Sequence, residues 1–370
     1  MIGHLSESGG AERFSLGLAT HLSQDRFEPW MCSPRGGEPA PIAALADAGV
    51  PFVDLGRRAK WDVHRLIGLA TLLRRQRFDI VHTHLFGSNL WGVIVGRACR
   101  VPVVIAHEHT WSYEGDALRA WLDGRVIGRL ATRFLAVSSA DAERMIRIEH
   151  VPSTKVVVIP SAYVPRSPVA GGDLRAELGL APGTPLLGTA AVMRPQKALD
   201  VLIEAHACVL GTVPSAHLVL AGFGECRPAL ERRARELGLQ ASTHFLGRRT
   251  DVDAILGSLD VAVMSSDFEG APLFVYECMA NRTPLVATAV GGLPDIVDDG
   301  ATGILVAPRR PLELAAALTA LLTDRERGRR LARAAAQRLP RYTIETISAR
   351  FADLYERLAA ESAGRGRPIR

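Results

Sequence analysis

Short runs of apolar residues alternate with helical patterns along almost the whole chain. In the first half, four such runs predict buried strands: 78–82, 102–106, 134–138 and 156–160. Amphipathic patterns at 63–75 and 89–98 predict helices between them. Strands that alternate with helices are typical of a parallel, doubly wound sheet with right-handed crossovers.

A second series of the same kind follows a stretch rich in proline and glycine at 161–173, which we interpret as a linker. Its expected strands are 186–190, 217–221, 243–247, 261–264 and 284–288. The fold class is therefore α/β, with two Rossmann-like doubly wound halves. We expect a first domain at 1–165, a second at 166–340, and a last helix at 345–361 that packs back onto the first domain.

The amino end departs from this pattern. The residues from Met1 to Ser6 predict a first strand of only about five residues, which is short for the central strand of a doubly wound sheet. Two interpretations stay open: the strand is simply short, or the true start lies a few codons upstream.

The composition bears on the size of the core and on the cellular compartment in which the protein is expected. The 370 residues include 48% hydrophobic ones, enough for two cores. The five cysteines are scattered and form no C-x-x-C pair, which argues against a disulfide framework and favours a reducing cytoplasm. We find no apolar run of membrane-spanning length and no signal-peptide pattern, so a cytoplasmic location is expected.

The net charge of +5 leaves two interpretations open: a soluble surface rich in arginine, or affinity for phosphates or an anionic membrane face. The basic stretch 57–61, which includes Trp61, and the nearby Arg74, Arg75 and Arg77 are either a solvated face or a peripheral contact with the cytoplasmic membrane. No nucleic-acid partner is expected.

The most informative segment is 265–280, which follows an expected strand. Glu269 falls in the strand-to-helix loop, Pro272 at the expected helix start, and Glu277 within the helix. Both carboxylates then lie at the carboxyl end of the sheet, where open α/β sheets bind ligands. Carboxylates accept hydrogen bonds from sugar hydroxyls, and the N–H groups of the helix start suit a phosphate. The alternative is two solvated glutamates beside a capped helix.

Other strand-to-helix loops carry weaker signals. Arg194 and Lys197 could clamp a diphosphate, although exposed cations are usually just solvated. Four glycines lie in such loops: Gly10, Gly222, Gly291 and Gly292. They would either let the backbone approach a ligand closely or simply make tight turns. The G-x-G at 222–224 lacks the third glycine of a dinucleotide fingerprint, so an NAD site is not predicted.

Histidines form two pairs, His82 with His84 and His107 with His109. Period-two spacing puts each pair on one face of a strand, which suits either a metal site or a histidine that donates to a sugar hydroxyl. Because no carboxylate completes a ligand set in phase, we expect no metal.

Together these motifs resemble family 4 of the retaining glycosyltransferases, which have the GT-B fold. The matching segments, in chain order, are Gly-Gly-Ala-Glu-Arg at 9–13, the strand 79–84, Val-Ser-Ser at 137–139, Arg-Pro-Gln-Lys at 194–197, Ala-Gly-Phe-Gly at 221–224, the E-x7-E pair at 269 and 277, and Gly-Gly-Leu-Pro-Asp at 291–295. Each is weak alone, but their order and spacing are specific.

The resemblance implies two domains that face a central cleft and a nucleotide-diphosphate sugar bound mainly by the second. It implies that Glu277 holds the ribose, and that Glu269 with the backbone of Gly270, Ala271, Pro272 and Leu273 faces the donor sugar. Arg194 and Lys197 would neutralise the leaving diphosphate, so neither a metal nor a cofactor is expected. His109, with His107 as the alternative, would assist at the sugar. The expected donor is a UDP- or GDP-sugar.

Several positions depart from the family pattern. Val192 stands where many members have arginine, Ser161 and Ala162 replace Asn-Gly, and Arg282 replaces a glycine. These changes put donor affinity in question and leave a non-catalytic nucleotide-sugar-binding descendant as one alternative. A nucleotide-sugar 2-epimerase is another, and a metal-dependent hydrolase a distant third. The principal hypothesis is a hexosyltransferase acting on an envelope glycan, a lipid-linked sugar or a small molecule.

Overall fold

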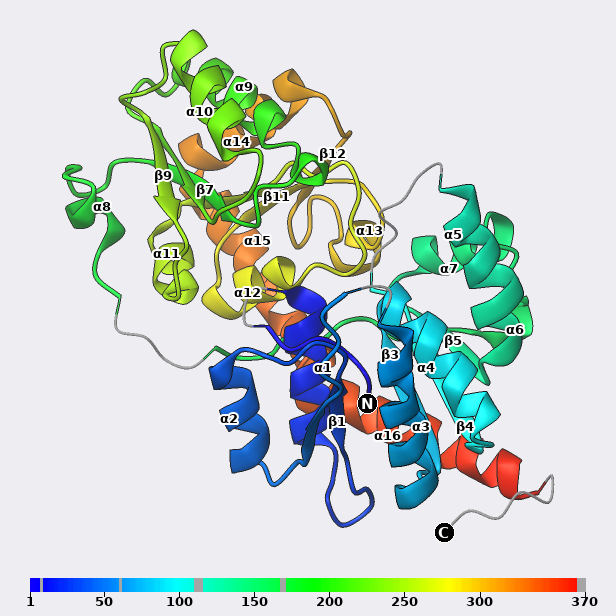
Figure 1. Ribbon diagram of the computed structural model, residues 1–370. Helices are drawn as coiled ribbons and strands as arrows, with labels where there is room; N and C mark the ends of the chain where they lie inside the picture. Colours follow the sequence, from blue (N-terminus) through cyan, green and yellow to red (C-terminus); the bar gives the residue numbers. More distant parts are fainter. Residues whose placement is uncertain (7–8, 60–61, 110–115, 167–170, 365–370) are drawn as a thin grey trace. The chain divides into compact units, whose positions relative to one another are not determined.

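The computed structural model describes residues 1–6, 9–59, 62–109, 116–166 and 171–364. The chain forms two units, shown along the sequence colours of Figure 1. The first comprises Met1–Val164 together with Arg341–Arg370, and the second comprises Pro165–Pro340. Each unit is an α/β structure with parallel strands, as the sequence predicts.

In the first unit, four parallel strands lie in the order β3-β4-β5-β6. Their bounds are β3 Ile80–His84, β4 Val103–His107, β5 Arg133–Ala136 and β6 Val156–Val158. These confirm the four expected strands, with starts that differ by up to two residues. A further pair, β1 (Met31–Ser33) and β2 (Phe52–Asp54), was not predicted.

The expected first strand is reduced to isolated bridges. Ile2 pairs in parallel with both Cys32 of β1 and Thr83 of β3, and Leu5 pairs with Gly37. A very short stretch of chain therefore joins the β1–β2 pair to the four-stranded sheet.

Helices cover both faces of this sheet. Helices α3 (Leu66–Gln76), α4 (Phe86–Ala98) and α7 (Ser139–Arg147) supply one core, and α1 (Gly10–His21) and α16 (Ile344–Ala363) supply the other. The remaining helices of the unit are α2 Pro39–Asp47, α5 Ala117–Leu122 and α6 Gly128–Leu130.

Helix α16 belongs to the first unit although it is last in the chain. The hydroxyl of Thr343 caps its start by accepting from the N–H of Thr346. Apolar residues recur along one face, and Ile347 and Phe351 pack with Phe14 of α1 in one buried cluster. The helix expected at 345–361 thus lies on the first unit.

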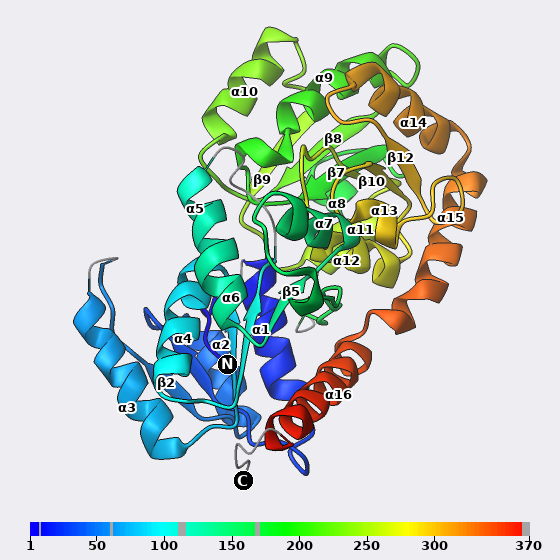
Figure 2. The ribbon, with the colours of Figure 1, turned by 90° about the vertical axis from the view of Figure 1, so that its right-hand side faces the viewer.

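The second unit holds a parallel sheet in the order β12-β11-β10-β7-β8-β9 (Figure 2). Its strands are β7 Leu186–Ala190, β8 His217–Ala221, β9 Thr243–Gly247, β10 Val261–Met264, β11 Leu285–Thr288 and β12 Ile304–Val306. The first five confirm the sequence prediction almost residue for residue, and β12 was not predicted. Its helices are α8 Leu174–Glu177, α9 Leu199–Leu210, α10 Arg227–Glu236, α11 Val252–Ser258, α12 Leu273–Asn281, α13 Leu293–Ile296, α14 Pro311–Thr323 and α15 Arg325–Arg338.

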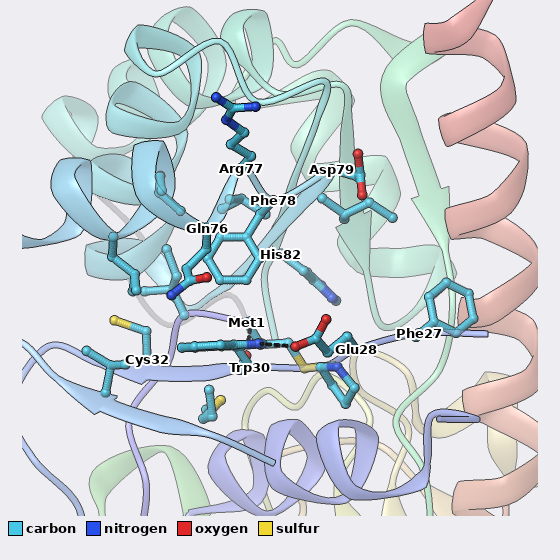
Figure 3. A pocket seen from close by; sticks show the side chains of 18 of the residues that line it. Met1, Phe27, Glu28, Trp30, Cys32, Gln76, Arg77, Phe78, Asp79 and His82 are labelled. Atoms are coloured by element: carbon cyan, nitrogen blue, oxygen red, sulfur yellow. Dashed lines mark hydrogen bonds between the residues drawn. The ribbon is translucent and has the colours of Figure 1, made fainter. Parts of the chain in front are cut away.

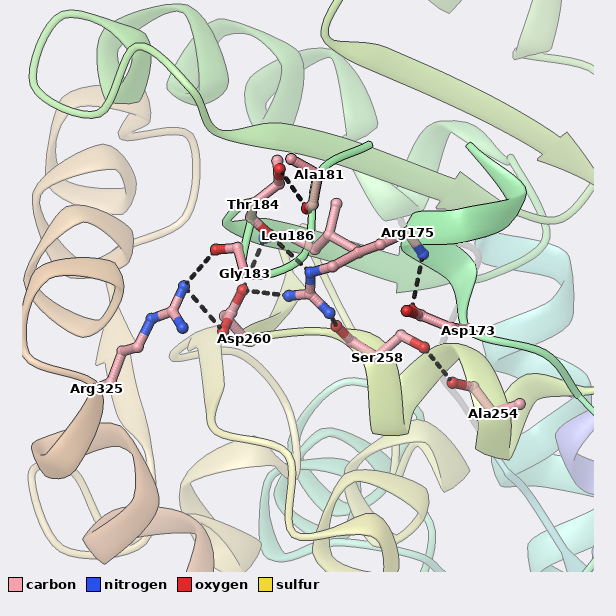
Figure 4. A network of polar contacts seen from close by, with 10 residues as sticks. All are labelled: Asp173, Arg175, Ala181, Gly183, Thr184, Leu186, Ala254, Ser258, Asp260 and Arg325. Carbon is pink, nitrogen blue, oxygen red and sulfur yellow. Dashed lines mark hydrogen bonds and ion pairs between the residues drawn. The ribbon is translucent and has the colours of Figure 1, made fainter. Parts of the chain in front are cut away.

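A polar network around Arg175 fixes α8 to the sheet of the second unit (Figure 4). The guanidinium donates to the carbonyl of Ser258 and to the carboxylate of Asp260, both at 2.7 Å. Asp260 also accepts from the N–H of Leu186, at the start of β7 (2.9 Å). One half-buried arginine therefore holds the strands β7 and β10 together at their amino ends.

Among the described residues, no helix is both long enough and apolar enough to cross a bilayer. Of the basic stretch expected to be either solvated or at a membrane, Lys60 and Trp61 lie outside the described residues. Arg57 is buried, so that side chain is not part of an exposed basic face.

Candidate active site

The strand order of the second unit reverses at one point. β7 is followed in the chain by β8 on one side of it, whereas β10, which pairs with its other side, is followed by β11 further out. The loops after β7 and β10 therefore diverge here, and such a switch point is where doubly wound sheets bind ligands. A small cavity of about 20 Å³ lies at these strand ends and is lined in part by Lys197, Ser265 and Ser266.

The two diverging loops are hydrogen-bonded to each other. The N–H of Asp267 donates to the carbonyl of Gln196 (2.8 Å), and the hydroxyl of Ser265 donates to the carbonyl of Lys197 (2.9 Å). The ammonium of Lys197 lies 2.6 Å from Oε1 of Glu269. The structure thus brings two of the predicted site residues, 72 positions apart, into direct contact.

Glu269 is almost fully buried, with 6% of its surface exposed. Its Oε1 also accepts from the hydroxyl of Ser266 at 2.6 Å. A buried carboxylate is costly unless charges and donors surround it, and Lys197 and Ser266 supply both. The carboxylate is held in one place at the end of β10.

Glu277 lies on α12, which the chain enters through Pro272. Pro272 is the N-cap residue rather than the first helical residue, a difference of one position from the prediction. The Glu277 side chain is 4% exposed; its Oε1 accepts a hydrogen bond from Nε of Arg166 (3.0 Å) and lies 2.9 Å from Nη2 of the same guanidinium. The predicted ribose-binding carboxylate is therefore paired with an arginine to which the sequence interpretation gave no role.

The glycines of these loops serve loop packing. Gly291 has a φ of +53°, and a Cβ there would lie 1.6 Å from the carbonyl oxygen of Glu269. The N–H of Gly292 donates to the carbonyl of Gly270 (3.0 Å). Gly222, with a φ of +136°, likewise leaves 1.9 Å between an added Cβ and the carbonyl oxygen of Ala191. These glycines let neighbouring loops touch, and the contact of Gly291 and Gly292 holds the backbone of Glu269 and Gly270.

Arg194 is exposed on the loop after β7. Its N–H donates to the carbonyl of Val192, and its carbonyl accepts from the N–H of Lys197. Of the two predicted diphosphate-binding cations, Arg194 is thus the N-cap of the short 3₁₀ segment Pro195–Lys197, and Lys197 is its last residue. Val192 therefore contributes a backbone contact where many family members have an arginine side chain.

The predicted histidine and Gly10 belong to the first unit. His109 follows β4, and its Nε2 lies 3.0 Å from Nδ1 of His84. Burial lowers the pKa of His109 to about 3, so its imidazole is neutral at physiological pH. Gly10 is the first residue of α1, after the N-cap Gly9, while Ser8, which begins the predicted glycine-rich turn, lies outside the described residues.

His82, His84 and His107 are also buried, with one ring nitrogen of each within 4.8 Å of the others, a set that could hold a metal ion. Desolvation holds the pKa of each well below its ordinary value. The rings of His82 and His107 stack with an interplanar angle of 10°. The expectation that no metal binds stays a prediction.

The structure shows the surroundings of the residues that depart from the family pattern. Arg282 ends α12 with a φ of +52°, a left-handed conformation that glycine adopts without strain. This left-handed backbone conformation explains why the family pattern has glycine where this chain has Arg282. Ser161 and Ala162 are both buried beside β6.

Two residues at the site carried no predicted role. Ser266 lies inside the segment 265–280, three residues before Glu269, and its hydroxyl donates to that carboxylate. This short spacing is the only sequence feature that could have pointed to the contact. Arg166 lies in the linker, 111 residues from Glu277, and no local pattern marks it.

The fold is that of the GT-B glycosyltransferases. HepE from Anabaena, crystallised in complex with UDP and glucose, superposes with a TM-score of 0.82 at 20% identity, over 96% of this chain and 98% of that one.

Sequence comparison places the chain within that class. Residues 172–338 match the family model of glycosyl transferases group 1, and residues 8–164 match that of glycosyltransferase family 4. D-inositol 3-phosphate glycosyltransferase from Streptomyces bingchenggensis is 31% identical over 79% of this chain and 69% of its own length. That from Nocardia farcinica is 33% identical over 69% of this chain, but the matched part is only 61% of its own length. The chain belongs to glycosyltransferase family 4.

Proposed function

We propose that this protein is a retaining glycosyltransferase. It moves a hexosyl group from a UDP- or GDP-sugar to an envelope glycan, a lipid-linked sugar or a small-molecule acceptor, and it needs no metal. The observation that carries this proposal is the pairing of Lys197 with the buried Glu269 where β7 and β10 diverge. A cation and a carboxylate fixed at a switch point suit a ligand that carries both phosphates and hydroxyls.

The donor would lie with its diphosphate near Lys197, Arg194 and the start of α12. Two cations and the N–H groups of a helix start offset the charge of a leaving diphosphate, the task that Mg²⁺ performs in metal-dependent enzymes. The C1–O bond to the β-phosphate breaks, and the bond from C1 to the acceptor oxygen forms. The acceptor proton passes to the leaving phosphate, so the reaction balances without a further reactant.

The carboxylates have separate roles in this proposal. Glu277, on the buried face of α12, accepts hydrogen bonds from the ribose hydroxyls. Glu269, with the backbone of Gly270, Ala271 and Leu273, faces the donor sugar. Acceptor attack on the face from which the diphosphate leaves retains the configuration at C1. His109 assists as a neutral imidazole, consistent with its lowered pKa.

We also propose the kind of acceptor and the cellular location of the enzyme. The name of the Nocardia and Streptomyces relatives specifies an inositol phosphate, which supports a polar, hydroxyl-bearing acceptor. Polysaccharide biosynthesis in the cytoplasm, at or near the inner membrane face, would bring such an acceptor and a nucleotide sugar together.

A thermal-shift screen against UDP, GDP, ADP, TDP and their common sugars, with and without EDTA, tests the proposal. A ligand at a hundred times its dissociation constant adds about 2.7 kcal/mol to the unfolding free energy. We expect one nucleotide family to stabilise the protein equally in both conditions. Stabilisation that EDTA abolishes would contradict metal independence, and no stabilisation by any nucleotide would contradict the donor site.

The product then separates transfer from its alternatives. Incubation of the donor with candidate acceptors, followed by proton NMR of the anomeric signal, should show a new glycoside with the configuration of the donor. An inverted product would overturn retention. An altered free sugar without acceptor would instead indicate a 2-epimerase, and donor binding without turnover would indicate a non-catalytic descendant.

A further inference from the structure

The proposed transfer leaves several features of the described residues without a role. In the first unit, a cavity of about 760 Å³ lies beside Ile2, and its lining includes Met1, Trp30 and Phe78 (Figure 3). None of its lining residues is among those proposed to bind the donor. In the second unit, by contrast, an arginine that the proposed transfer does not use, Arg309, contacts the donor loops directly.

Arg309 follows β12 and uses all three nitrogens of its guanidinium. Its Nε donates to Oδ1 of Asp267 (2.6 Å), and its Nη2 pairs with the other oxygen of the same carboxylate. Its Nη1 donates to Oδ2 of Asp200 at 3.0 Å. A two-point contact of this kind fixes both the distance and the direction of a carboxylate, which a single contact does not. One side chain therefore joins two aspartates that belong to different segments.

These two aspartates lie on the segments that carry the paired donor residues. Asp267 is in the loop after β10, two residues before Glu269, and Asp200 is in the first turn of α9, three residues after Lys197. Lys197 and Glu269 are themselves paired at 2.6 Å. The two segments are therefore tied at two points, directly through Lys197 and Glu269 and indirectly through Arg309.

The strand order makes the contact of Arg309 a long-range one. The sheet runs β12-β11-β10-β7, so Arg309 reaches past the end of β11 to Asp267. The end of β11 makes a connection in the same direction, because the hydroxyl of Thr288 donates to the carbonyl of Ser266 (2.6 Å). The hydroxyl of Ser266 in turn donates to Glu269. The outer strands of the sheet thus support the loop of Glu269 at two places.

The backbone of Arg309 is in the left-handed conformation, with a φ of +57°. This conformation is unfavourable for every residue except glycine, because the Cβ crowds the neighbouring carbonyl. The contacts that accompany it are exposed: 51% of the Arg309 side chain and 52% of the Asp200 side chain are accessible. Exposed ion pairs contribute little to stability. Stability alone is therefore a poor explanation for an arginine at this position, whereas its contacts suit the placing of two loops.

We propose that Arg309 is a positioning residue for the glycosyl transfer, which sets the separation of Lys197 and Glu269 by holding Asp200 and Asp267 together. This inference rests on the proposed function of the site. Lys197 acts on the leaving diphosphate and Glu269 faces the donor sugar, so a change in their separation misplaces one of them relative to the bond that breaks. A misplacement of about 1 Å can lower a rate by as much as about 10²-fold.

Three variants of the full chain test the proposal. Arg309→Gly removes the contacts and relieves the left-handed conformation, whereas Arg309→Lys keeps the charge without the two-point contact. Arg310→Gln removes the charge of the next residue, which is also exposed, and is the matched control.

Each variant is examined by three measurements. Urea unfolding gives stability, and the release of UDP from UDP-glucose and of GDP from GDP-mannose, with water as the acceptor, gives turnover. Amide hydrogen exchange at Asp267 reports on the loop contact itself, because this N–H donates to the carbonyl of Gln196 (2.8 Å).

We expect Arg309→Gly to unfold at a urea concentration no lower than the parent protein, since relief of the left-handed conformation offsets the loss of exposed ion pairs. Its nucleotide release should nevertheless slow by about tenfold. Its Asp267 amide should exchange about tenfold faster, relative to the amides of β8. Arg309→Lys should give intermediate values, and Arg310→Gln should match the parent protein in all three measurements.

Unchanged exchange at Asp267 in Arg309→Gly would overturn the proposed connection between Arg309 and the donor loops. Faster exchange with an unchanged rate of release would overturn the positioning role, and so would a loss of stability that accounts for the loss of rate. If the parent protein released no nucleotide from either donor, the proposed function would fail for these donors. The exchange at Asp267 would still decide whether Arg309 holds the loops.

A double variant tests whether Arg309 acts through Asp267. Asp267→Asn combined with Arg309→Gly should slow nucleotide release no more than either change alone, because both remove the same contact. Additive losses would overturn a shared role.

Discussion

The guanidinium of Arg166 forms an ion pair with the carboxylate of Glu277: Nε donates a hydrogen bond to Oε1, and Nη2 lies 2.9 Å from the same oxygen. Glu277 is buried, whereas 26% of the Arg166 side chain is exposed. The arginine offsets the cost of burying the carboxylate, and it comes from the linker rather than from the sheet. The carboxylate that we propose for ribose recognition is therefore held in one orientation by Arg166 before any nucleotide binds.

Replacing Glu277 by glutamine should weaken nucleotide binding by tenfold or more. The amide keeps the shape but loses the charged acceptor, and hydrogen bonds to charged groups contribute about 1.5–3 kcal/mol. Isothermal titration calorimetry with the nucleotide identified by thermal shift measures the change. Glu313→Ala, at an exposed position on α14, is the matched control. Unchanged affinity in Glu277→Gln would remove Glu277 from the donor site.

Replacing Lys197 by alanine should slow transfer by about 100-fold while changing nucleoside affinity little. The cation is proposed to act on the diphosphate as its charge develops, and loss of one such group costs about 10²–10³ in rate. Comparison of kcat with the Kd of the free nucleoside measures the two effects. Arg232→Ala, an exposed cation of α10, is the control. An equal loss of nucleoside affinity would contradict a role at the leaving group.

Replacing Gly291 by alanine should lower the free energy of unfolding by about 2 kcal/mol and weaken donor binding. The new Cβ would overlap the carbonyl of Glu269, so the loop after β10 must move. Urea unfolding and calorimetry measure the two effects. Gly300→Ala separates this overlap from the backbone conformation, since Gly300 also has a positive φ but nothing near its Cβ position. Equal effects in both variants would mean that the overlap is relieved locally.

The stability of the protein should fall as pH drops below about 6.5. Burial lowers the pKa of His109 to about 3, so the folded state keeps this ring neutral while the unfolded chain takes up a proton. The stabilisation from the neutral ring is complete above the unfolded pKa and is lost between about 6.5 and 3, at about 1.4 kcal/mol per pH unit for each such group. Urea unfolding from pH 7.5 to 5 measures the slope.

A variant with phenylalanine at His109 should show a shallower pH slope, by about one proton. His64→Gln, at an exposed position, should keep the slope of the parent protein. A slope unchanged by His109→Phe would mean that this ring is protonated in the folded state.

Replacing Arg282 by glycine should raise the free energy of unfolding by about 0.5 kcal/mol. The left-handed conformation costs a non-glycine residue about 1–2 kcal/mol, and the greater flexibility of glycine in the unfolded chain offsets part of the gain. Urea unfolding of Arg282→Gly and Arg282→Ala measures it. Alanine keeps the strain, so equal gains in both variants would attribute the effect to the arginine side chain instead.

The sequence predicted the strands of the second unit because each is a short apolar run between clear loop signals. It did not predict β1, β2 or β12, which have three residues each and lie among partly polar neighbours. Such short strands exist only because a neighbouring strand supplies their hydrogen bonds. The first strand was expected to be short, yet only the folded sheet revealed the cavity beside it.

The sequence by itself determined the alternation of strands and helices, the family, and the loops that carry Lys197, Glu269 and Glu277, because these depend on local periodicity and spacing. Only the tertiary structure decided which side chains meet. It paired Glu269 with Lys197 and Ser266, and Glu277 with the linker residue Arg166. It also showed that Gly291 is needed by a neighbouring loop. Burial and contact between residues far apart in the chain set these relationships, and no local pattern records them.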